Sequence, residues 1–532
     1  MLSRTCSRCL VVVSLLALTA FFLRAVSLDV QSLWRDEVDA LRFATLPWSE
    51  MLSNFTRPGW NGPLYYVLLR AWIAFTGTSE YAMRFFSLVF GVLCVPLIYV
   101  LGRRLFNPSV GVVSALLVTV SPYLVWYSQE VKMYTLVLGS ALLAIYSLRR
   151  ALEGGGWPWW LAQIVGTTLA FYSHILAALL IPVQVLLYFA WWPRARRRWR
   201  GALVSLAFLT LPYLPLVAWQ APLALKTRET GFYHYSLNQM VVILLNSWST
   251  GVTEWGRPWG PALMGLLAIG GFGVAIPGLL PFSSPGEEAG LETGIGHHLA
   301  LFIWLLFPVL SIWFISLRQP LFTDRYLIWS IPAFYLLIAY TLVWFAGAQD
   351  SSQWVAVLLL GVILIVYGFN VQRQADTLIK SDFRAAAAYV ANYEEPTKAV
   401  EHSTPETEQP FQYYLPLTVA GQSGFTDLII FQIPHGRYTF DYYFPIEGYP
   451  WAEGLYTNLQ TPDGAYRMSA REAAESMSQM TEGYDTVWLV ATEVSMWDER
   501  HLVQEWLDQH GRRVTAAHFT HVDVYRYALP DA

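Results

Sequence analysis

The dominant pattern in this sequence is a succession of apolar runs separated by short polar segments. A membrane-spanning helix needs about 20 apolar residues to cross roughly 30 Å of hydrocarbon. The pattern predicts eleven transmembrane helices, and ten or twelve would also fit. We place them near residues 10–28, 82–101, 109–127, 134–149, 158–173, 175–192, 201–219, 259–280, 299–317, 326–346 and 353–371.

The pattern changes after the last of these runs, where shorter apolar stretches alternate with polar ones. The expected elements are a helix from Ser381 or Asp382 to about Asn392, a strand at Thr486–Ala491, a helix at Asp498–Gln509 and one or two strands within Val514–Leu529. We therefore predict a polytopic α-helical membrane domain at 1–371, with a long first outer loop at 29–81. A compact α/β domain is expected at 372–532.

Composition and charge support this division. Only 14% of the 532 residues are charged and 55% are hydrophobic, whereas soluble globular chains carry about 25% charged residues. Residues 372–532 hold 11 Lys and Arg against 23 Asp and Glu, a net charge of −12, and residues 1–371 carry +8. A basic membrane domain with an acidic soluble domain does not fit a nucleic-acid-binding protein. Three cysteines are too few for a disulfide framework.

The arginine clusters predict the orientation in the membrane. If the spans alternate, Arg4 and Arg8, Arg103 and Arg104, Arg149 and Arg150, and the cluster at 194–200 all fall on one side. Short loops rich in Lys and Arg face the cytoplasm. The N-terminus is therefore expected in the cytoplasm of a plasma-membrane protein, with residues 372–532 outside. Every unusual polar cluster then faces outward, including the adjacent acids Asp36 and Glu37, which predicts an outward-facing active site.

Several short segments carry a resemblance to a known family over roughly residues 15–395. They are Leu33–Glu37 (LWRDE), Gly62–Tyr66 (GPLYY), Glu80–Ser87 (EYAMRFFS), Gly102–Phe106 (GRRLF), Ser128–Tyr134 (SQEVKMY), Arg325–Leu327 (RYL) and Asp382–Arg384 (DFR). In order and spacing the chain resembles the GT-C class of membrane glycosyltransferases, specifically family 39, the dolichyl-phosphate-mannose–protein mannosyltransferase-like proteins. Two positions depart from it. Bacterial relatives often have His near Trp60-Asn61-Gly62, and usually Arg in place of Lys132.

The resemblance implies transfer of a sugar, such as the hexose mannose, from a polyprenyl-phosphate carrier to an acceptor on the outer face, with inversion. It implies that Asp36 is the general base and that Glu37 orients Asp36, the acceptor or a metal. Glu130 would be a second acid at the same cavity, while Lys132 and Arg325 would contact the phosphate. Such roles fit general-base catalysis by a carboxylate and charge-assisted binding of phosphate.

Other readings of these residues remain open at this point. Glu130 and Lys132 could lie at lipid headgroups, and Arg325 could pair with Asp324. Arg84, His174 and Tyr65 are further candidates for substrate binding. For Arg84 the spacing favours an i,i+4 pair with Glu80 instead. His174 also fits a cavity-lining hydrogen bonder, and Tyr65 the start of a juxtamembrane helix. Asp382 and Arg384 are expected to cap and dock the C-terminal domain.

The expected partners are a polyprenyl-phosphate-linked sugar donor, membrane lipids and a protein, lipid or glycan acceptor. A divalent cation such as Mg²⁺ or Mn²⁺ suits acidic ligands, for which Asp36, Glu37 and Glu130 are the candidates. The main alternative function is a polyprenyl-linked lipid or sugar transporter or flippase. Transporters show internal symmetry and ionisable residues deep within spans, and neither is evident here. A surface-assembly protein with a membrane anchor and an aminoarabinose transferase of lipid A are further alternatives.

Overall fold

The computed structural model describes residues 4–55, 61–214, 232–273, 288–348, 352–393, 426–461 and 463–530. The chain forms two compact units. The first comprises Met1–Asp29 and Ala40–Thr377, and the second comprises Val30–Asp39 and Leu378–Ala532. The segment Val30–Asp39, which carries the adjacent acids, thus belongs to the second unit and not to the helical one.

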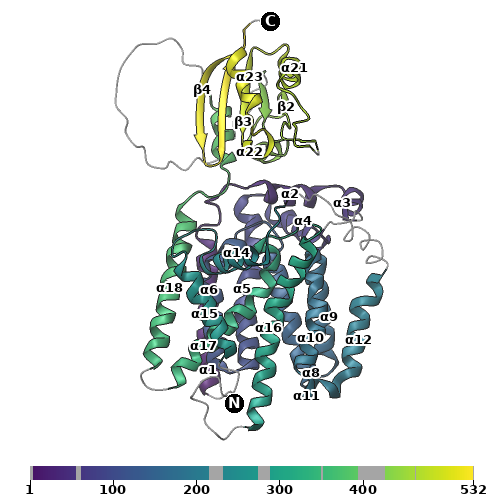
Figure 1. Ribbon diagram of the computed structural model, residues 1–532, viewed down its shortest axis with the longest axis vertical. Helices are drawn as coiled ribbons and strands as arrows, with labels where there is room; N and C mark the ends of the chain where they lie inside the picture. The colour runs from purple at the N-terminus through teal and green to yellow at the C-terminus, as the bar shows by residue number, and fades with distance from the viewer. Residues whose placement is uncertain are drawn as a thin grey trace. The chain divides into compact units, whose positions relative to one another are not determined.

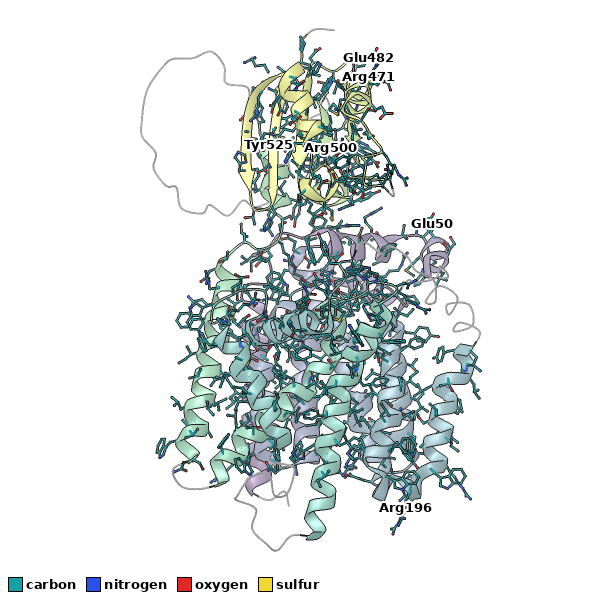
Figure 2. The ribbon with its side chains drawn as sticks, in the orientation of Figure 1. Glu50, Arg196, Arg471, Glu482, Arg500 and Tyr525 are labelled. Atoms are coloured by element: carbon teal, nitrogen blue, oxygen red, sulfur yellow. The ribbon has the colours of Figure 1, made fainter. Side chains whose placement is uncertain are left out.

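The first unit is a bundle of helices that run alongside one another (Figure 1). Its helices are α1 (Arg4–Ala25), α3 (Trp48–Phe55), α4 (Leu64–Thr76), α5 (Glu80–Leu105), α6 (Pro108–Val120), α7 (Pro122–Ser128), α8 (Tyr134–Leu152), α9 (Trp157–Ser173), η1 (Ile175–Leu179), α10 (Leu180–Ala190), α11 (Trp192–Ala195), η2 (Arg196–Arg198), α12 (Trp199–Thr210), η3 (Leu211–Tyr213), α14 (Leu237–Thr250), α15 (Trp259–Gly273), α16 (Glu288–Ser316), η4 (Asp324–Ser330), α17 (Ile331–Ala348) and α18 (Ser352–Asp376). Helix α2 (Arg35–Thr45) begins in the second unit and ends in the first. Figure 2 shows Glu50 and Arg196 at opposite ends of the bundle, as expected for an outer loop and a cytoplasmic one.

Each of the eleven predicted spans coincides with helical backbone, although the last residues of those at 201–219 and 259–280 lie outside the described residues. A helical membrane protein is therefore confirmed. Within the described ranges, six helices are long and apolar enough to cross a membrane, or seven if the bent pair α6–α7 is one span. The helices at Leu64–Thr76, Ile175–Ala190 and Trp259–Gly271 are apolar but shorter. The count of eleven stays a prediction.

Two local features shape the packing of the helices in the bundle. Gly102 of α5 and Gly111 of α6 allow a close approach, because a Cβ at Gly111 would lie 2.6 Å from the carbonyl oxygen of Tyr99. Helices α6 and α7 are bent by 58°. The bend falls at Ser121 and Pro122, where the Ser121 hydroxyl accepts from the Leu124 N–H and caps α7. A proline at this first helical position costs no internal hydrogen bond.

The second unit is an α/β domain around a five-stranded sheet with the order β2-β1-β3-β5-β4. Strands β1, β2 and β3 are parallel, whereas β5 is antiparallel to both β3 and β4. Its elements are α19 (Phe383–Ala391), β1 (Leu428–Phe431), α20 (Gly436–Tyr443), β2 (Trp451–Glu453), α21 (Ala470–Thr481), β3 (Thr486–Ala491), α22 (Val494–Trp497), α23 (Leu502–His510), β4 (Arg512–Phe519) and β5 (Val522–Ala528).

Both faces of this sheet are covered by helices. Alternate residues of β3 point to opposite faces. Trp488 and Val490 join a core with Phe383 of α19 and Phe440 of α20. Val487 and Leu489 join a second core with Met477 of α21 and Val503 and Leu507 of α23. The helix expected after Asp382, the strand at Thr486–Ala491 and the two C-terminal strands are confirmed, although β4 begins at Arg512, before Val514. The helix expected at Asp498–Gln509 begins four residues later, at Leu502. Asp382, not Ser381, provides the cap, since its side chain accepts from the Ala385 N–H.

Candidate active site

Lys132, Arg325 and His174 come together in the first unit from distant parts of the sequence. Lys132 lies between α7 and α8, Arg325 lies in η4 and His174 follows α9. His174 is only 3% exposed. Its burial, followed by the charges of Arg325 and Lys132, lowers the pKa of His174 to about 3. At neutral pH the site therefore holds two cationic side chains beside a neutral imidazole.

The imidazole of His174 has a polar atom available for a ligand. Among the described residues, none forms a hydrogen bond with its buried Nδ1. The Tyr326 ring packs beside it, with 4.6 Å between the ring centroids. A neutral imidazole donates from one nitrogen and accepts at the other. His174 can therefore contact a hydroxyl or a phosphate oxygen, as a cavity-lining hydrogen bonder would.

A hydrogen-bonded chain links Tyr65 to Lys132. The Ser87 hydroxyl donates to the carbonyl oxygen of Lys132 over 3.0 Å. Because that bond uses its one proton, the Tyr65 hydroxyl, 3.2 Å away, donates to Ser87 Oγ. Thr135 Oγ1 donates to the carbonyl of Ser87 over 2.7 Å. Tyr65 thus supports the backbone at Lys132, and its predicted contact with substrate stays a prediction.

Glu130 and Lys132 are enclosed by the protein. Glu130 is 1% exposed and Lys132 is 9% exposed. The Lys132 N–H donates to the Glu130 carbonyl oxygen over 2.7 Å, which makes the segment a tight turn. The charges of Glu130 and Arg325 both act on Tyr127. Burial of this kind argues against the alternative in which Glu130 and Lys132 simply lie at lipid headgroups.

Arg24 contacts the start of the segment that runs from Ser128 to Lys132. No motif in the sequence pointed to this residue. It is fully buried. Its guanidinium donates to the carbonyl oxygens of Thr119 and Val118, each over 3.0 Å, and its Nε donates to Ser128 Oγ over 3.0 Å. In return, Gln129 Nε2 donates to the Arg24 carbonyl over 2.9 Å. Arg24 therefore ties both sides of the α6–α7 bend and the chain that continues to Lys132. An ionisable residue in an apolar span was the available signal.

The position that departs from the family lies against the turn that carries His174. Asn61 Oδ1 accepts from the Ile175 N–H over 3.2 Å, directly after His174. A Cβ at Gly62 would lie 2.1 Å from the Tyr172 carbonyl oxygen, so only glycine allows this approach. Asn61 and Gly62 therefore shape the turn at His174, where relatives often have a histidine nearby.

The two remaining arginine candidates differ in their surroundings. Arg84 is 1% exposed in α5, and its guanidinium donates to the Leu28 carbonyl oxygen over 2.9 Å. This contact gives Arg84 a structural task at the end of the first span, and its contact with substrate stays a prediction. Arg325 is half-buried at the start of η4, where it shares the surroundings of His174. A half-buried guanidinium there remains accessible to an anionic ligand.

Asp36 and Glu37 lie in the first turn of α2, within the second unit. Glu37 is fully buried, and its Oε2 accepts from Lys380 Nζ over 2.9 Å. Asp36 is half-buried, and its charge acts on Glu493, which follows β3. The pKa of Glu493 is lowered, mainly by His435, whose Nε2 lies 3.9 Å from the carboxylate. Sequence reasoning missed Lys380, Glu493 and His435, because no local pattern connects them to residues 36–37.

The residues predicted to bind a metal ion do not form a cluster among the described residues. Within the part of the chain that the structure describes, no group of three or more His, Cys, Asp and Glu side chains is arranged to hold an ion. Glu37, one of the three candidate ligands, already faces the ammonium group of Lys380. We derive no step that uses Mg²⁺ or Mn²⁺, and a bound divalent cation stays a prediction.

Comparison with known proteins supports the class of protein indicated by the motifs. The family model described as dolichyl-phosphate-mannose-protein mannosyltransferase matches residues 58–219. A search of curated protein sequences found no match. The matched segment contains Tyr65, Arg84, Glu130, Lys132 and His174. It ends before Arg325 and begins after Asp36.

Solved structures of similar fold cover nearly the whole chain. ArnT from Cupriavidus metallidurans, solved bound to undecaprenyl phosphate, matches with a TM-score of 0.54 and 13% identity over 97% of each chain. The archaeal oligosaccharyltransferase AglB from Archaeoglobus fulgidus, solved with an inhibitory peptide and a dolichol-phosphate, matches with a TM-score of 0.51 and 12% identity, over 97% of this chain and 74% of its own. The resemblance to the GT-C class of membrane glycosyltransferases is thus confirmed. Within that class, the chain is similar to the protein mannosyltransferases.

Proposed function

We propose that this protein is an integral-membrane glycosyltransferase that moves a sugar from a polyprenyl-phosphate carrier to an acceptor on the outer face of the plasma membrane. The sugar is a hexose such as mannose, and the acceptor is a protein, lipid or glycan. Polyprenyl-type phosphates are bound by both similar structures, ArnT and AglB. The proposal extends that ligand class to this chain.

The observation that carries the proposal is the convergence of Lys132 and Arg325 around the neutral His174. A lipid phosphate that leaves the sugar carries negative charge, which positioned cations stabilise in a partly dry site. Lys132 supplies a compact point charge and Arg325 a planar fork suited to two phosphate oxygens. Because His174 is neutral, it adds a hydrogen bond without adding a third positive charge.

In the proposed reaction the acceptor hydroxyl attacks the anomeric carbon from the face opposite the phosphate. Its O–H bond breaks and the proton passes to the carboxylate of Asp36, the general base. The new bond joins the acceptor oxygen to the anomeric carbon, while the bond from that carbon to the phosphate oxygen breaks. The products are an inverted glycoside and the polyprenyl phosphate, held by Lys132 and Arg325.

The proposed orientation places the N-terminus in the cytoplasm and the second unit outside. It rests on the arginine clusters at 103–104, 149–150 and 194–200, and Arg196 lies at the end of the bundle opposite Glu50 (Figure 2). Alkaline phosphatase fused after Ala532 should be active, and green fluorescent protein at the same position should be dark. The reverse result would place the site on the cytoplasmic side and contradict the proposal.

Donor binding tests the central claim. Losing one charge-assisted hydrogen bond costs roughly 1.5–3 kcal/mol, so Lys132→Ala and Arg325→Ala should each weaken donor binding about tenfold to a hundredfold. The measurement is titration of the purified protein in nanodiscs with a polyprenyl-phospho-mannose and with the lipid phosphate alone. Lys132→Arg should retain much of the affinity.

The matched control is Arg318→Ala, which removes an exposed arginine from the segment before η4. It should leave donor affinity unchanged. If neither Lys132→Ala nor Arg325→Ala alters donor affinity or turnover, these residues are ordinary boundary cations and the proposed phosphate site is wrong. Lipid movement across the vesicle without sugar transfer would favour the transporter alternative.

A further inference from the structure

The segment that carries Asp36 is built into the second unit by hydrogen bonds. Gln31 Oε1 accepts from the N–H groups of Ile379 and Lys380 over 2.9 and 3.2 Å. Ser32 Oγ donates to the Ser381 carbonyl oxygen over 2.8 Å. These bonds fix residues 31 and 32 against the chain that enters α19. The backbone that precedes Asp36 is thus held by residues almost 350 positions further along the sequence.

Tyr443 and Arg384 make further contacts with the segment that precedes Asp36. The N–H of Leu33 donates to the Tyr443 hydroxyl over 2.6 Å. Arg384 Nη2 donates to the Gln31 carbonyl oxygen over 3.3 Å, with its guanidinium carbon 5.9 Å from the centroid of the Tyr443 ring. Tyr443 ends α20 and Arg384 lies in α19, so two helices of the second unit hold the same short segment.

The strongest contact is the ion pair between Glu37 and Lys380. The Glu37 side chain is 0% exposed and that of Lys380 is 4% exposed, with 2.9 Å between Oε2 and Nζ. Lys380 Nζ also lies 5.9 Å from the centroid of the Trp34 ring. Lys380 therefore contacts residues on both sides of Asp36. Removing one member of a buried pair leaves an uncompensated buried charge, so the geometry depends on both.

This pair also determines which way Asp36 points. Successive side chains of a helix are separated by about 100° around its axis. With Glu37 turned into the buried pair, Asp36 is directed elsewhere, and it remains half-buried where Glu37 is enclosed. One acid of the pair thus serves as the anchor and the other stays accessible.

We propose that Lys380 and Tyr443 are positioning residues for Asp36, and that Glu37 acts through its pair with Lys380 and not by touching the substrate. Residues of the second unit then hold the catalytic base in position. This inference rests on the proposed function, in which Asp36 accepts the acceptor proton. A displacement of the base of about 1 Å can lower the rate about a hundredfold. The contacts of Lys380 and Tyr443 with the segment around Asp36 should therefore affect the rate of sugar transfer.

Single and double variants of the pair test the role of Glu37. Lys380→Met and Glu37→Gln should each lower kcat about tenfold to a hundredfold, with the KM for the donor within about twofold of the wild type. The double variant, Glu37→Gln with Lys380→Met, leaves no unpaired charge and should recover at least about threefold over either single variant. A double variant no better than Glu37→Gln would show that Glu37 has a direct chemical role, and would overturn the proposal.

Two further variants keep the test decisive if a buried charge prevents folding. Tyr443→Phe removes only the hydroxyl that accepts from Leu33, and should lower kcat several-fold without lowering the unfolding temperature. Arg471→Met, on α21 and labelled in Figure 2, has an 89% exposed side chain and should behave as wild type. Wild-type kcat in well-folded Tyr443→Phe and Lys380→Met would overturn the positioning role.

The outcomes also separate this inference from the proposed function. If Asp36→Asn is inactive and the Lys380 and Tyr443 variants are fully active, the assignment of Asp36 as the base holds. The positioning role of Lys380 and Tyr443 is then wrong. If Asp36→Asn itself transfers sugar normally, the assignment of the base is wrong, whatever the Lys380 variants do.

Discussion

The two units hold their candidate residues in opposite ways. In the first unit, Lys132 lies between α7 and α8 and Arg325 lies in η4, and their charges act on a buried neutral histidine. In the second unit, Asp36 lies beside a glutamate whose charge is matched by Lys380. The first region therefore places two basic side chains near a buried imidazole, while in the second a buried ion pair lies directly beside a half-buried carboxylate. The difference suggests separate tasks, which separate substitutions should reveal.

The largest expected effect is in the second unit. Asp36→Asn keeps size and polarity but cannot accept the hydroxyl proton. Positioned acid–base groups contribute about 10²–10⁴-fold to rate, so sugar transfer should fall by that factor while donor binding persists. Transfer should be measured with a labelled polyprenyl-phospho-sugar, and binding with the same lipid. Glu37→Gln serves as the comparison and should have a smaller effect. Normal transfer by well-expressed Asp36→Asn would leave Glu37 or Glu130 as the candidate base.

A second prediction tests the first unit through Arg24. Arg24→Met removes the donors to the Thr119 and Val118 carbonyls and to Ser128. Each buried group left unsatisfied costs about 1–3 kcal/mol, and the bend that leads to Lys132 should loosen. Donor KM should rise about tenfold with a smaller change in kcat, the reverse of the pattern expected for Asp36→Asn.

The control for this variant is Arg8→Met, an exposed arginine on the same helix. Arg24→Lys should restore part of the donor affinity, because it keeps the charge but offers fewer directed donors. A lower kcat at unchanged donor KM in Arg24→Met would show that Arg24 does not act through Lys132.

The sequence predicted what local patterns encode. Apolar runs gave the helices of the bundle, and the strand at Thr486–Ala491 has the bounds expected of it. Lys132 and Arg325, which belong to two of the motifs, lie near His174, and their contact with substrate stays a prediction. The attachment of residues 30–39 to the second unit had no such signal, since Lys380 reads as a cation following the last helix. Its contact with Glu37 depends on tertiary packing across 343 positions. The neutral state of His174 likewise follows from burial, which a loop sequence does not show.

The smallest expected effect is on stability in mild acid, and it differs between the units. The pKa of His174 is about 3 in the folded protein, against an ordinary value of 6.5. Between these values the unfolded chain binds a proton that the folded protein does not, so stability falls as pH falls below 6.5. By pH 5 the loss is roughly 2 kcal/mol. Glu493 behaves differently. Its lowered pKa contributes stability that is lost only below about its ordinary value of 4.5.

Thermal unfolding in detergent at pH 7 and pH 5 measures this difference. In the wild type the midpoint should fall on acidification, and His174→Gln should reduce that fall because the titrating group is gone. The matched control is His518→Gln, which replaces a histidine whose side chain is 67% exposed. Its unfolding midpoint should fall between pH 7 and pH 5 by as much as that of the wild type. Glu493→Gln should also leave the fall from pH 7 to pH 5 unchanged, because the contribution of Glu493 persists throughout this range. An equal fall in wild type and His174→Gln would mean that His174 is not held neutral beside Lys132 and Arg325, and would remove the contrast in charge between the two regions.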